Sequence, residues 1–247
     1  GKYSSYYTRL DRSLYSFGKN EFGQLGLSDT VDRSIPEFVM ADVYKIEAGY
    51  NHAEALCENG SVFTWGDNSR GQLGRKSDLT YSAIPVNIEN VTASAIFAGG
   101  WESVYCVNSV LYKCGAYQDN SSFSLMDLEN VNQISLGIIS LAKDIDGNIW
   151  GWGHSNFENN LYNLKTSVPQ KISFDYDFKE VDSYRLQTIA IDDCGKVYSW
   201  GTGYFADGSD KEASHGSPII IDNIDNAVKV VRGKNHNLVL NDFGQVY

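Results

Sequence analysis

The sequence predicts an all-β fold assembled from repeats, and three observations lead to this prediction. The stretch YSFGKNEFGQLG at residues 15–26 returns as FTWGDNSRGQLG at 63–74, and its opening returns as YSWG at 198–201. Short apolar or alternating runs are separated by turns rich in Asn, Asp and Gly, which is typical of β-hairpins. No apolar pattern of helical period lasts three turns, so the core has to be built from strands.

A glycine follows each aromatic strand and sets the period of the repeat. Successive copies are 48, 49, 38 and 48 residues apart, and they are Gly18, Gly66, Gly115, Gly153 and Gly201. A period near fifty is typical of a propeller or a solenoid. We expect an N-terminal extension over 1–13, pairing with a terminal blade, and repeats over 14–247 with boundaries near 61, 110, 148 and 196.

Within a repeat the elements can be assigned in order. The runs HAEAL (52–56) and SVFTW (61–65) are predicted strands, and ENG (58–60) is the tight turn between them. The stretch 66–74 then turns the chain, where Gly71 and Gly74 permit a positive φ or the close approach of a neighbouring strand. We expect the strand-ending tryptophans to pack between blades, and these are Trp65, Trp152 and Trp200.

Composition limits the class of protein. The chain has 247 residues and is 42% hydrophobic, which supports a sizeable core, and no apolar run approaches the ~20 residues that span a bilayer. Its net charge of −11 should repel phosphate backbones, so we expect no direct nucleic-acid binding. The same charge either suits a basic protein partner or serves only to keep the protein soluble.

The four cysteines favour a reducing compartment. No C-x-x-C pair occurs among Cys57, Cys106, Cys114 and Cys194, and the first three lie in apolar, strand-like stretches. Buried free thiols are therefore favoured over disulfides or a zinc site. We expect the protein in the cytoplasm, the nucleus or both.

Motifs for covalent chemistry are missing from the sequence. Phosphate-binding loops, zinc-protease helices and G-x-S-x-G are absent. The stretch DIDGN (144–148) resembles a calcium loop, but an ordinary turn is the favoured interpretation. His52 and His236 share one repeat position and are interpreted as structural hydrogen-bonding residues. We predict no catalytic residue, no metal site and no cofactor.

The repeats resemble those of the regulator of chromosome condensation family. The pattern V-Y/F-x-W/F-G-x-N-x-x-G-Q-L-G, then a proline, then I-x-A-G-x-x-H-x-x-A-L, is carried almost whole by the first two repeats, including Pro36 and Pro85. The resemblance implies a seven-bladed β-propeller with four-stranded blades of about fifty residues. Repeat three has Cys114 in place of the tryptophan, and repeats three to five lack GQLG. Since five repeats are visible, we expect part of a seven-bladed ring, the alternative being five units that close.

Equivalent loops of successive blades converge on one face of a propeller, so their variable positions are candidates for binding. One column of the repeat holds Tyr50, Gly100, Ile138, Arg185 and Lys234. The next holds Asn51, Trp101, Ile139, Leu186 and Asn235, and the third holds His52, Glu102, Ser140, Gln187 and His236. Aromatic residues and arginine are enriched at binding hot spots. We predict a partner-binding face made of Tyr50, Asn51, Trp101, Glu102, Arg185, Lys234 and Asn235, with packing as the alternative for Trp101 and Ile139.

The resemblance implies two functions of different classes. One is a guanine-nucleotide exchange factor for a Ran-, Rab- or Arf-type small GTPase, which needs only a face that binds the nucleotide-free form better. The other is a non-catalytic adaptor of a larger complex, for example a tRNA- or diphthamide-modification or trafficking assembly, because GWES (100–103) resembles a variant seen in such members. We expect a protein-binding propeller, with GTPase regulation as its most specific function.

Overall fold

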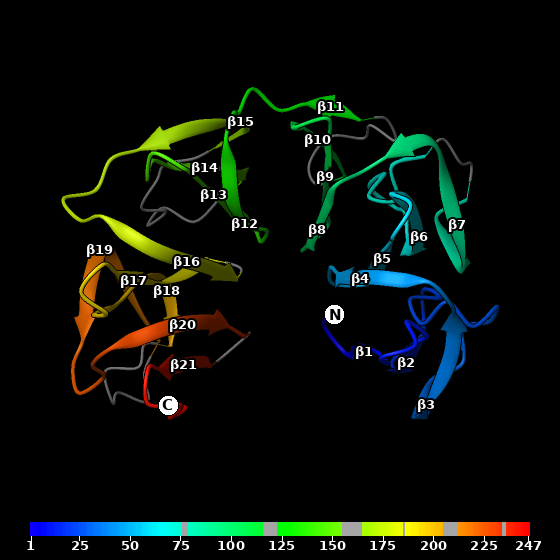
Figure 1. Cartoon of the computed structure of the whole chain (residues 1–247), viewed down its shortest axis with the longest axis horizontal. Helices are drawn as coiled ribbons and strands as arrows, with labels where there is room; N and C mark the ends of the chain where they lie inside the picture. The colour runs from blue at the N-terminus through cyan, green and yellow to red at the C-terminus, as the bar shows by residue number, and fades with distance from the viewer. Residues whose placement is uncertain (76–78, 116–122, 155–164, 185, 205–211, 234–235) are drawn as a thin grey trace. The chain divides into compact units, whose positions relative to one another are not determined.

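The computed structural model describes residues 1–75, 79–115, 123–154, 165–184, 186–204, 212–233 and 236–247. These residues form twenty-one strands and contain no helix (Figure 1), so the all-β prediction is confirmed. Consequently, the described part of the chain contains no helix long and apolar enough to cross a membrane. The strands group into two compact units, Gly1–Glu129 and Asn130–Tyr247.

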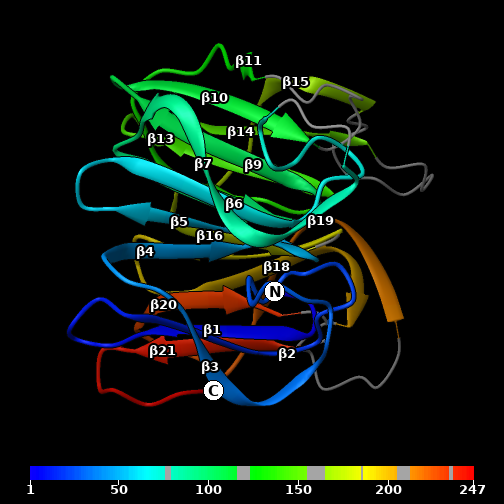
Figure 2. The same cartoon turned by 90° about the vertical axis from the view of Figure 1, so that its right-hand side faces the viewer.

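Unit 1 contains three antiparallel sheets that follow one another in chain order. Their strand orders are β1-β2-β3, β4-β5-β6-β7 and β11-β10-β9-β8. The strands are β1 Ser4–Thr8, β2 Leu14–Gly18, β3 Arg33–Met40, β4 Val43–Ala48, β5 His52–Cys57, β6 Ser61–Asp67, β7 Tyr81–Thr92, β8 Ala95–Gly99, β9 Glu102–Val107, β10 Val110–Gly115 and β11 Ser124–Leu125. Contacts of β1 with β4 and of β4 with β8 stack the sheets, as Figure 2 shows from blue to green.

Unit 2 also contains three antiparallel sheets. Their strand orders are β12-β13-β14-β15, β16-β17-β18-β19 and β20-β21. The strands are β12 Val131–Ser135, β13 Ile139–Asp144, β14 Ile149–His154, β15 Lys165–Ile172, β16 Phe178–Tyr184, β17 Gln187–Asp192, β18 Val197–Tyr204, β19 Glu212–Ile221, β20 Ala227–Arg232 and β21 Asn237–Asn241. Four of the six sheets thus have the four strands expected of a blade.

The sequence repeat and the sheets are out of phase. The predicted boundaries near 61, 110, 148 and 196 fall at the starts of β6, β10, β14 and β18, which are third strands of their sheets. A repeat counted from these points therefore joins the last two strands of one sheet to the first two of the next. The predicted extension 1–13 contains β1, which pairs with β2 from Ser4–Gly18 to Thr8–Leu14.

The repeated glycine is explained by a close approach inside each sheet. Gly66, the penultimate residue of β6, has φ +95°, and a Cβ on it would lie 2.4 Å from the carbonyl oxygen of Asn51. The other four copies also have positive φ, and a Cβ would lie 2.0–2.4 Å from the carbonyl oxygens of Tyr3, Trp101, Ile138 and Leu186. Since both the backbone conformation and the facing carbonyl exclude a side chain, only glycine fits.

The pairing corrects the predicted columns in the 38-residue repeat. Gly153 pairs with Ile139, as Gly66 pairs with His52, and in both hairpins the paired residues are 14 positions apart. Ile139, not Ser140, is therefore the counterpart of His52. The prediction was one residue late because it gave this repeat the shorter hairpin spacing of repeat three, where Gly115 pairs with Glu102.

The tryptophans at the ends of the aromatic strands are buried. In unit 1, Trp65 lies in a core cluster with Leu14 of the preceding sheet, and its Nε1 donates a hydrogen bond of 2.7 Å to the carbonyl of Gln24. In unit 2, Trp200 packs among residues of two sheets, including Leu141. Trp152 is 1% exposed. Trp65 and Trp200 thus each pack their own sheet against the preceding one.

Candidate protein-binding site

Three loops at one end of unit 1 are joined by backbone hydrogen bonds. The Lys2 N–H donates to the Tyr50 carbonyl at 3.0 Å, and the Tyr50 N–H donates to the Gly100 carbonyl at 2.8 Å. Each of these residues stands two positions before the start of its strand, β1, β5 or β9. Equivalent loops of three successive sheets therefore lie side by side.

A second set of contacts fixes the loop between β4 and β5. The Asn51 carbonyl accepts a hydrogen bond of 2.8 Å from the N–H of Asp67, where the chain leaves β6. Gly49 closes the same loop by donating its N–H to the His52 carbonyl at 3.0 Å. Because its backbone groups are bonded on both sides, this loop presents its side chains in one arrangement.

Three of the loop side chains form a compact group, which we call the Trp101 cluster: Tyr50, Arg70 and Trp101. The Tyr50 and Trp101 rings meet edge to face, with centroids 4.9 Å apart and planes at 82°. The Arg70 guanidinium lies 4.8 Å from the centroid of the Trp101 ring. Edge-to-face and cation–π contacts each contribute roughly 0.5–1.5 kcal/mol, so the cluster holds its own geometry.

Glu102, the residue after Trp101 in the chain, forms a buried ion pair with Lys113. The Glu102 Oε1 lies 3.7 Å from the Lys113 Nζ, and the two side chains are 4% and 10% exposed. Burial lowers the pKa of Lys113, and the neighbouring carboxylate opposes this. Glu102 was predicted on the binding face, and in the structure its side chain is buried.

His52 is a neutral structural residue at the base of the same loops. It is 1% exposed, and its Nε2 lies 3.1 Å from the Ser103 Oγ of the next sheet. Burial lowers the pKa of His52 to about 3, so the ring does not carry charge at neutral pH. A Cβ on Gly49 would lie 2.1 Å from the His52 Cε1, and the same clash, at 2.4 Å, would join Gly233 to His236. The G-x-x-H spacing thus reserves room for the imidazole, although His236 itself is exposed.

Between the second and third sheets lies a buried acid that the sequence analysis did not single out. Glu54 on β5 is completely buried near the Tyr105 hydroxyl. Burial raises the pKa of Glu54 well above its usual range, and the Tyr105 hydroxyl opposes this rise only in part. The signal in the sequence was a glutamate inside the strand-like run HAEAL. In the structure every residue of this run is buried.

Metal binding finds no support in the described residues, where no group of three or more His, Cys, Asp or Glu could hold an ion. The DIDGN stretch is a turn. The Asp144 Oδ1 accepts the N–H groups of Asp146 and Asn148 at 3.1 and 2.8 Å, and its Oδ2 accepts the Trp150 Nε1–H at 3.0 Å. Its carboxylate is therefore occupied by its own hairpin. The four cysteines are free thiols.

The family model for the Regulator of chromosome condensation (RCC1) repeat matches residues 11–56 and 59–106, and a second model of this repeat matches 43–72. Residues 11–106 therefore carry RCC1 repeats, and the whole chain is RCC1-like. The ultraviolet-B receptor UVR8 of Arabidopsis thaliana is 28% identical over 221 residues, which are 78% of this chain and 50% of that protein. The X-linked retinitis pigmentosa GTPase regulator of Mus musculus is 50% identical over 66 residues, 25% of this chain and 7% of that one.

A solved structure shows the fold that these RCC1 repeats adopt. Prp20p from Saccharomyces cerevisiae superposes with a TM-score of 0.82 at 22% identity, over 98% of this chain and 67% of that one. The described sheets and this likeness confirm an RCC1-like repeat β-propeller fold. The chain spans half the length of UVR8 and smaller shares of other curated relatives.

The third repeat has Cys114 in place of the tryptophan, and the structure shows what takes the place of the indole. In the preceding repeat, a Cβ on Gly26 would lie 3.0 Å from the Trp65 Nε1. At the equivalent Gly74, it would lie 2.7 Å from the Phe123 Cζ and 3.1 Å from the Cys114 Sγ. Phe123 therefore reaches in from another part of the chain and fills the position.

The RCC1 loops bring together only part of the predicted face. Tyr50, Asn51 and Trp101 lie on adjoining loops of unit 1, whereas Arg185, Lys234 and Asn235 lie outside the described residues. Arg70 was missed because it lies inside GDNSRGQLG, which was interpreted as architecture. The available signal was variation within that motif, since Arg70 replaces Phe22 of the first copy.

Proposed function

We propose that this chain is a protein-binding β-propeller that regulates a small GTPase, and that the Trp101 cluster is part of its docking face. The observation that carries the proposal is the cluster itself. An indole in contact with both a tyrosine ring and a guanidinium, on loops joined by backbone hydrogen bonds, is a rigid group of the residue types that dominate binding hot spots.

The relatives support the GTPase as the partner. The mouse relative is named a GTPase regulator, and the Prp20p structure was described together with its binding to Gsp1p and histones. The repeats shared with the mouse relative amount to 66 residues. They therefore support the class of partner and leave the particular GTPase to be found by experiment.

The residues of the face fit regulation by differential binding. His52 is neutral and Glu102 is paired with Lys113, so neither is poised to transfer a proton at neutral pH. Nucleotide exchange requires no such step. A face that binds the empty GTPase more tightly than the loaded one lowers nucleotide affinity by the same factor, because the two equilibria are linked.

The test is the release of a fluorescent GDP analogue from purified Ran-, Rab- and Arf-type GTPases in the presence of the full chain. One of them should release nucleotide faster, and Trp101→Ala should slow that release by about tenfold, as expected for removal of a hot-spot side chain. Tyr44→Ala removes an aromatic ring that is 65% exposed on β4 and is the matched control.

The same proteins distinguish exchange from an adaptor role. A GTPase captured when stripped of nucleotide and released by GTP supports exchange. A partner that binds equally in every nucleotide state, with no acceleration of release, contradicts the proposal and favours the adaptor.

A further inference from the structure

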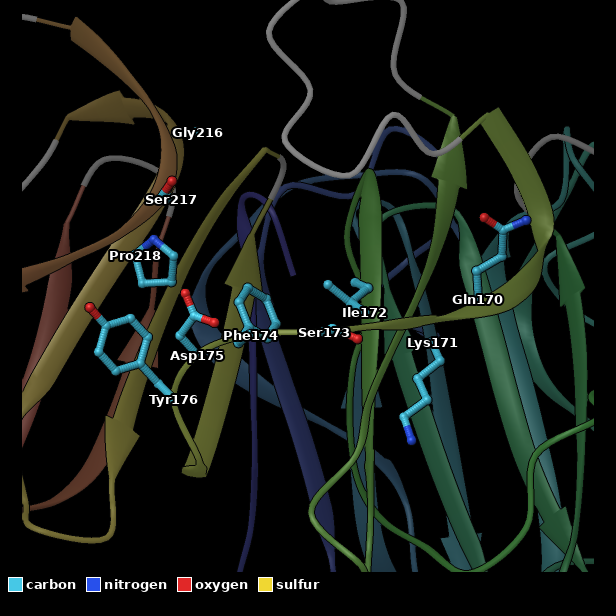
Figure 3. A pocket seen from close by; sticks show the side chains of 10 residues that line it. All are labelled: Gln170, Lys171, Ile172, Ser173, Phe174, Asp175, Tyr176, Gly216, Ser217 and Pro218. Atoms are coloured by element: carbon cyan, nitrogen blue, oxygen red, sulfur yellow. The ribbon is translucent and has the colours of Figure 1, made fainter.

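A hollow lies on unit 2 between the β15–β16 connection and β19 (Figure 3). It encloses about 470 Å³, within the range of pockets that hold small ligands or a few side chains. Phe174, Asp175 and Tyr176 line it from the connection, and Ser217 and Pro218 line it from β19. We call it the Asp175 hollow.

An irregularity of β19 contributes one wall of the hollow. The β18–β19 pairing shifts register between Ser199–Ile219 and Gly201–His215, so three residues of β19 face one of β18. Ser217 and Pro218 belong to this bulge. A bulge bends its strand and withdraws residues from the ladder, which turns them toward the connection opposite.

The two aromatic side chains of the hollow, Phe174 and Tyr176, pack against rings of the unit's interior. The Tyr176 ring lies 4.8 Å from the Tyr198 ring, whose hydroxyl donates to the Asp192 Oδ2 at 3.0 Å. The Phe174 ring lies 5.4 Å from Phe178, which belongs to the core cluster of the unit. Since both rings rest on fixed neighbours, the wall is formed before any ligand arrives, and this lowers the entropic cost of binding.

Polar groups of the hollow remain open to a ligand. Asp175 and Tyr176 are exposed, and among the described residues neither the carboxylate nor the tyrosine hydroxyl has a hydrogen-bond or ion-pair partner. Figure 3 shows Asp175 between the Phe174 and Tyr176 rings with Pro218 beside them, and Lys171 and Gln170 on the other side of the view. An open carboxylate beside a tyrosine face is a favourable position for a cation.

The turns at the end of unit 2 that holds the hollow are acidic, and Lys171 is the one cation in the described lining. The turns at this end of unit 2 lie at 144–148, 173–177, 192–196, 222–226 and 241–245, because antiparallel strands place alternate connections together. They carry Lys196 and nine aspartates, which are Asp144, Asp146, Asp175, Asp177, Asp192, Asp193, Asp222, Asp225 and Asp242. The potential here attracts positively charged segments.

We propose that the Asp175 hollow docks an extended basic peptide segment of a partner protein. An arginine or lysine lies over Tyr176 and pairs with Asp175, and a proline or aliphatic residue packs against Phe174 and Pro218. Aromatic-lined grooves of this kind accept extended, proline-containing chains, and the carboxylate supplies selectivity for a basic residue. The site is separate from the Trp101 cluster and does not depend on GTPase regulation.

The test uses the full chain and two fluorescein-labelled peptides of equal length in fluorescence anisotropy. One alternates arginine with proline and alanine, and the other has glutamate at every arginine position. The arginine peptide should bind saturably and the glutamate peptide should not. Asp175→Asn and Tyr176→Ala should each weaken binding by about tenfold. Asp146→Asn removes the same charge from an exposed turn outside the hollow and should change affinity by less than about twofold.

Several outcomes would overturn the proposal. Equal losses for Asp175→Asn and Asp146→Asn would show non-specific attraction to the acidic end. Equal binding of the two peptides, or no saturable binding of the arginine peptide, would exclude a cation site. Asp175→Asn replaces an exposed side chain by one of the same size, so an unchanged melting temperature separates lost binding from lost folding.

Discussion

At the scale of the residue, Glu54 is unusual because it is an ionisable side chain in the interior. It is fully buried, and the equally buried Tyr105 hydroxyl lies near its carboxyl group. A buried carboxyl in such surroundings stays protonated rather than accept an unpaired charge. Glu54 therefore makes the stability of the fold sensitive to pH.

Glu54→Gln should stabilise the protein at neutral pH. Because burial raises the pKa of Glu54, the native state holds a proton that the unfolded chain releases above its usual carboxyl pKa. The free energy of unfolding is then unaffected below that value and falls by about 1.4 kcal/mol per pH unit as the pH rises toward the native pKa. Urea unfolding at several pH values should show a gain for Glu54→Gln that grows with pH.

The control for this prediction is Glu89→Gln on the exposed part of β7. That variant should follow the wild-type curve at every pH. A constant difference between Glu54→Gln and wild type across the pH range would mean that Glu54 is ionised in the native protein.

At the scale of the element, unit 2 builds the same hairpin turn three times. Asp144, Asp192 and Asn241 each accept backbone N–H groups two and four residues later through their Oδ1. A glycine with positive φ follows three residues after each, at Gly147, Gly195 and Gly244. The side chain thus satisfies the orphan donors of the turn, and the glycine supplies the left-handed residue.

Asp144→Ala should destabilise the protein by about 2–3 kcal/mol, because the buried side chain accepts four hydrogen bonds worth roughly 1 kcal/mol each, with incomplete additivity. Asp144→Asn keeps the Oδ1 acceptor, as the third copy does with Asn241, and should lose about half as much. Chemical denaturation measures both values. A larger loss for Asn than for Ala would show that charge, and not turn geometry, is what Asp144 supplies.

A second element-scale feature is the exchange of a tryptophan for Cys114 and Phe123. The Cys114 Sγ lies 3.5 Å from the Gln72 carbonyl, just as the Trp65 Nε1 contacts the carbonyl of the equivalent Gln24. Phe123 occupies the space beside it, edge to face with Tyr105 at 5.2 Å. Cys114 of β10 and Phe123, which precedes β11, thus together fill the space of one tryptophan.

Cys114→Trp should cost about 1–3 kcal/mol because the indole meets Phe123, and overpacking a core has costs of this size. Combining it with Phe123→Ala should recover at least about 1 kcal/mol relative to the sum of the single changes. A double-mutant cycle by urea unfolding measures this coupling. Additive losses would mean that the two side chains do not share one space.

At the scale of the whole molecule, the net charge of −11 decides which partners are favoured. The same acidity that favours a basic peptide disfavours phosphate backbones, whose binding depends on neutralisation by Lys and Arg. In band-shift experiments at about 0.15 M salt, we expect no shift of duplex DNA or RNA at about 10 µM chain. A salt-sensitive shift would reveal a basic surface that the overall charge conceals.

The sequence was sufficient wherever the determining contact repeats at a fixed spacing. The period alone predicts three features: the repeated glycines, the packing of Trp65 and Trp200, and the position of the loops. It does so because every repeat meets the same neighbour in the same register. The period failed at Ile139, where two hairpin lengths fit the spacing equally well and only the pairing with Gly153 decides.

What the tertiary structure alone decided are the contacts that do not repeat. Arg70 contacts Trp101, and Phe123 fills the space that a tryptophan at position 114 would occupy. Glu54 lies near Tyr105, and the bulge of β19 lies opposite Asp175. Each depends on how two separate segments approach in the folded chain, and no periodic pattern records such an approach. The repeat therefore determined the fold of this protein, and departures from the repeat determined its candidate binding sites.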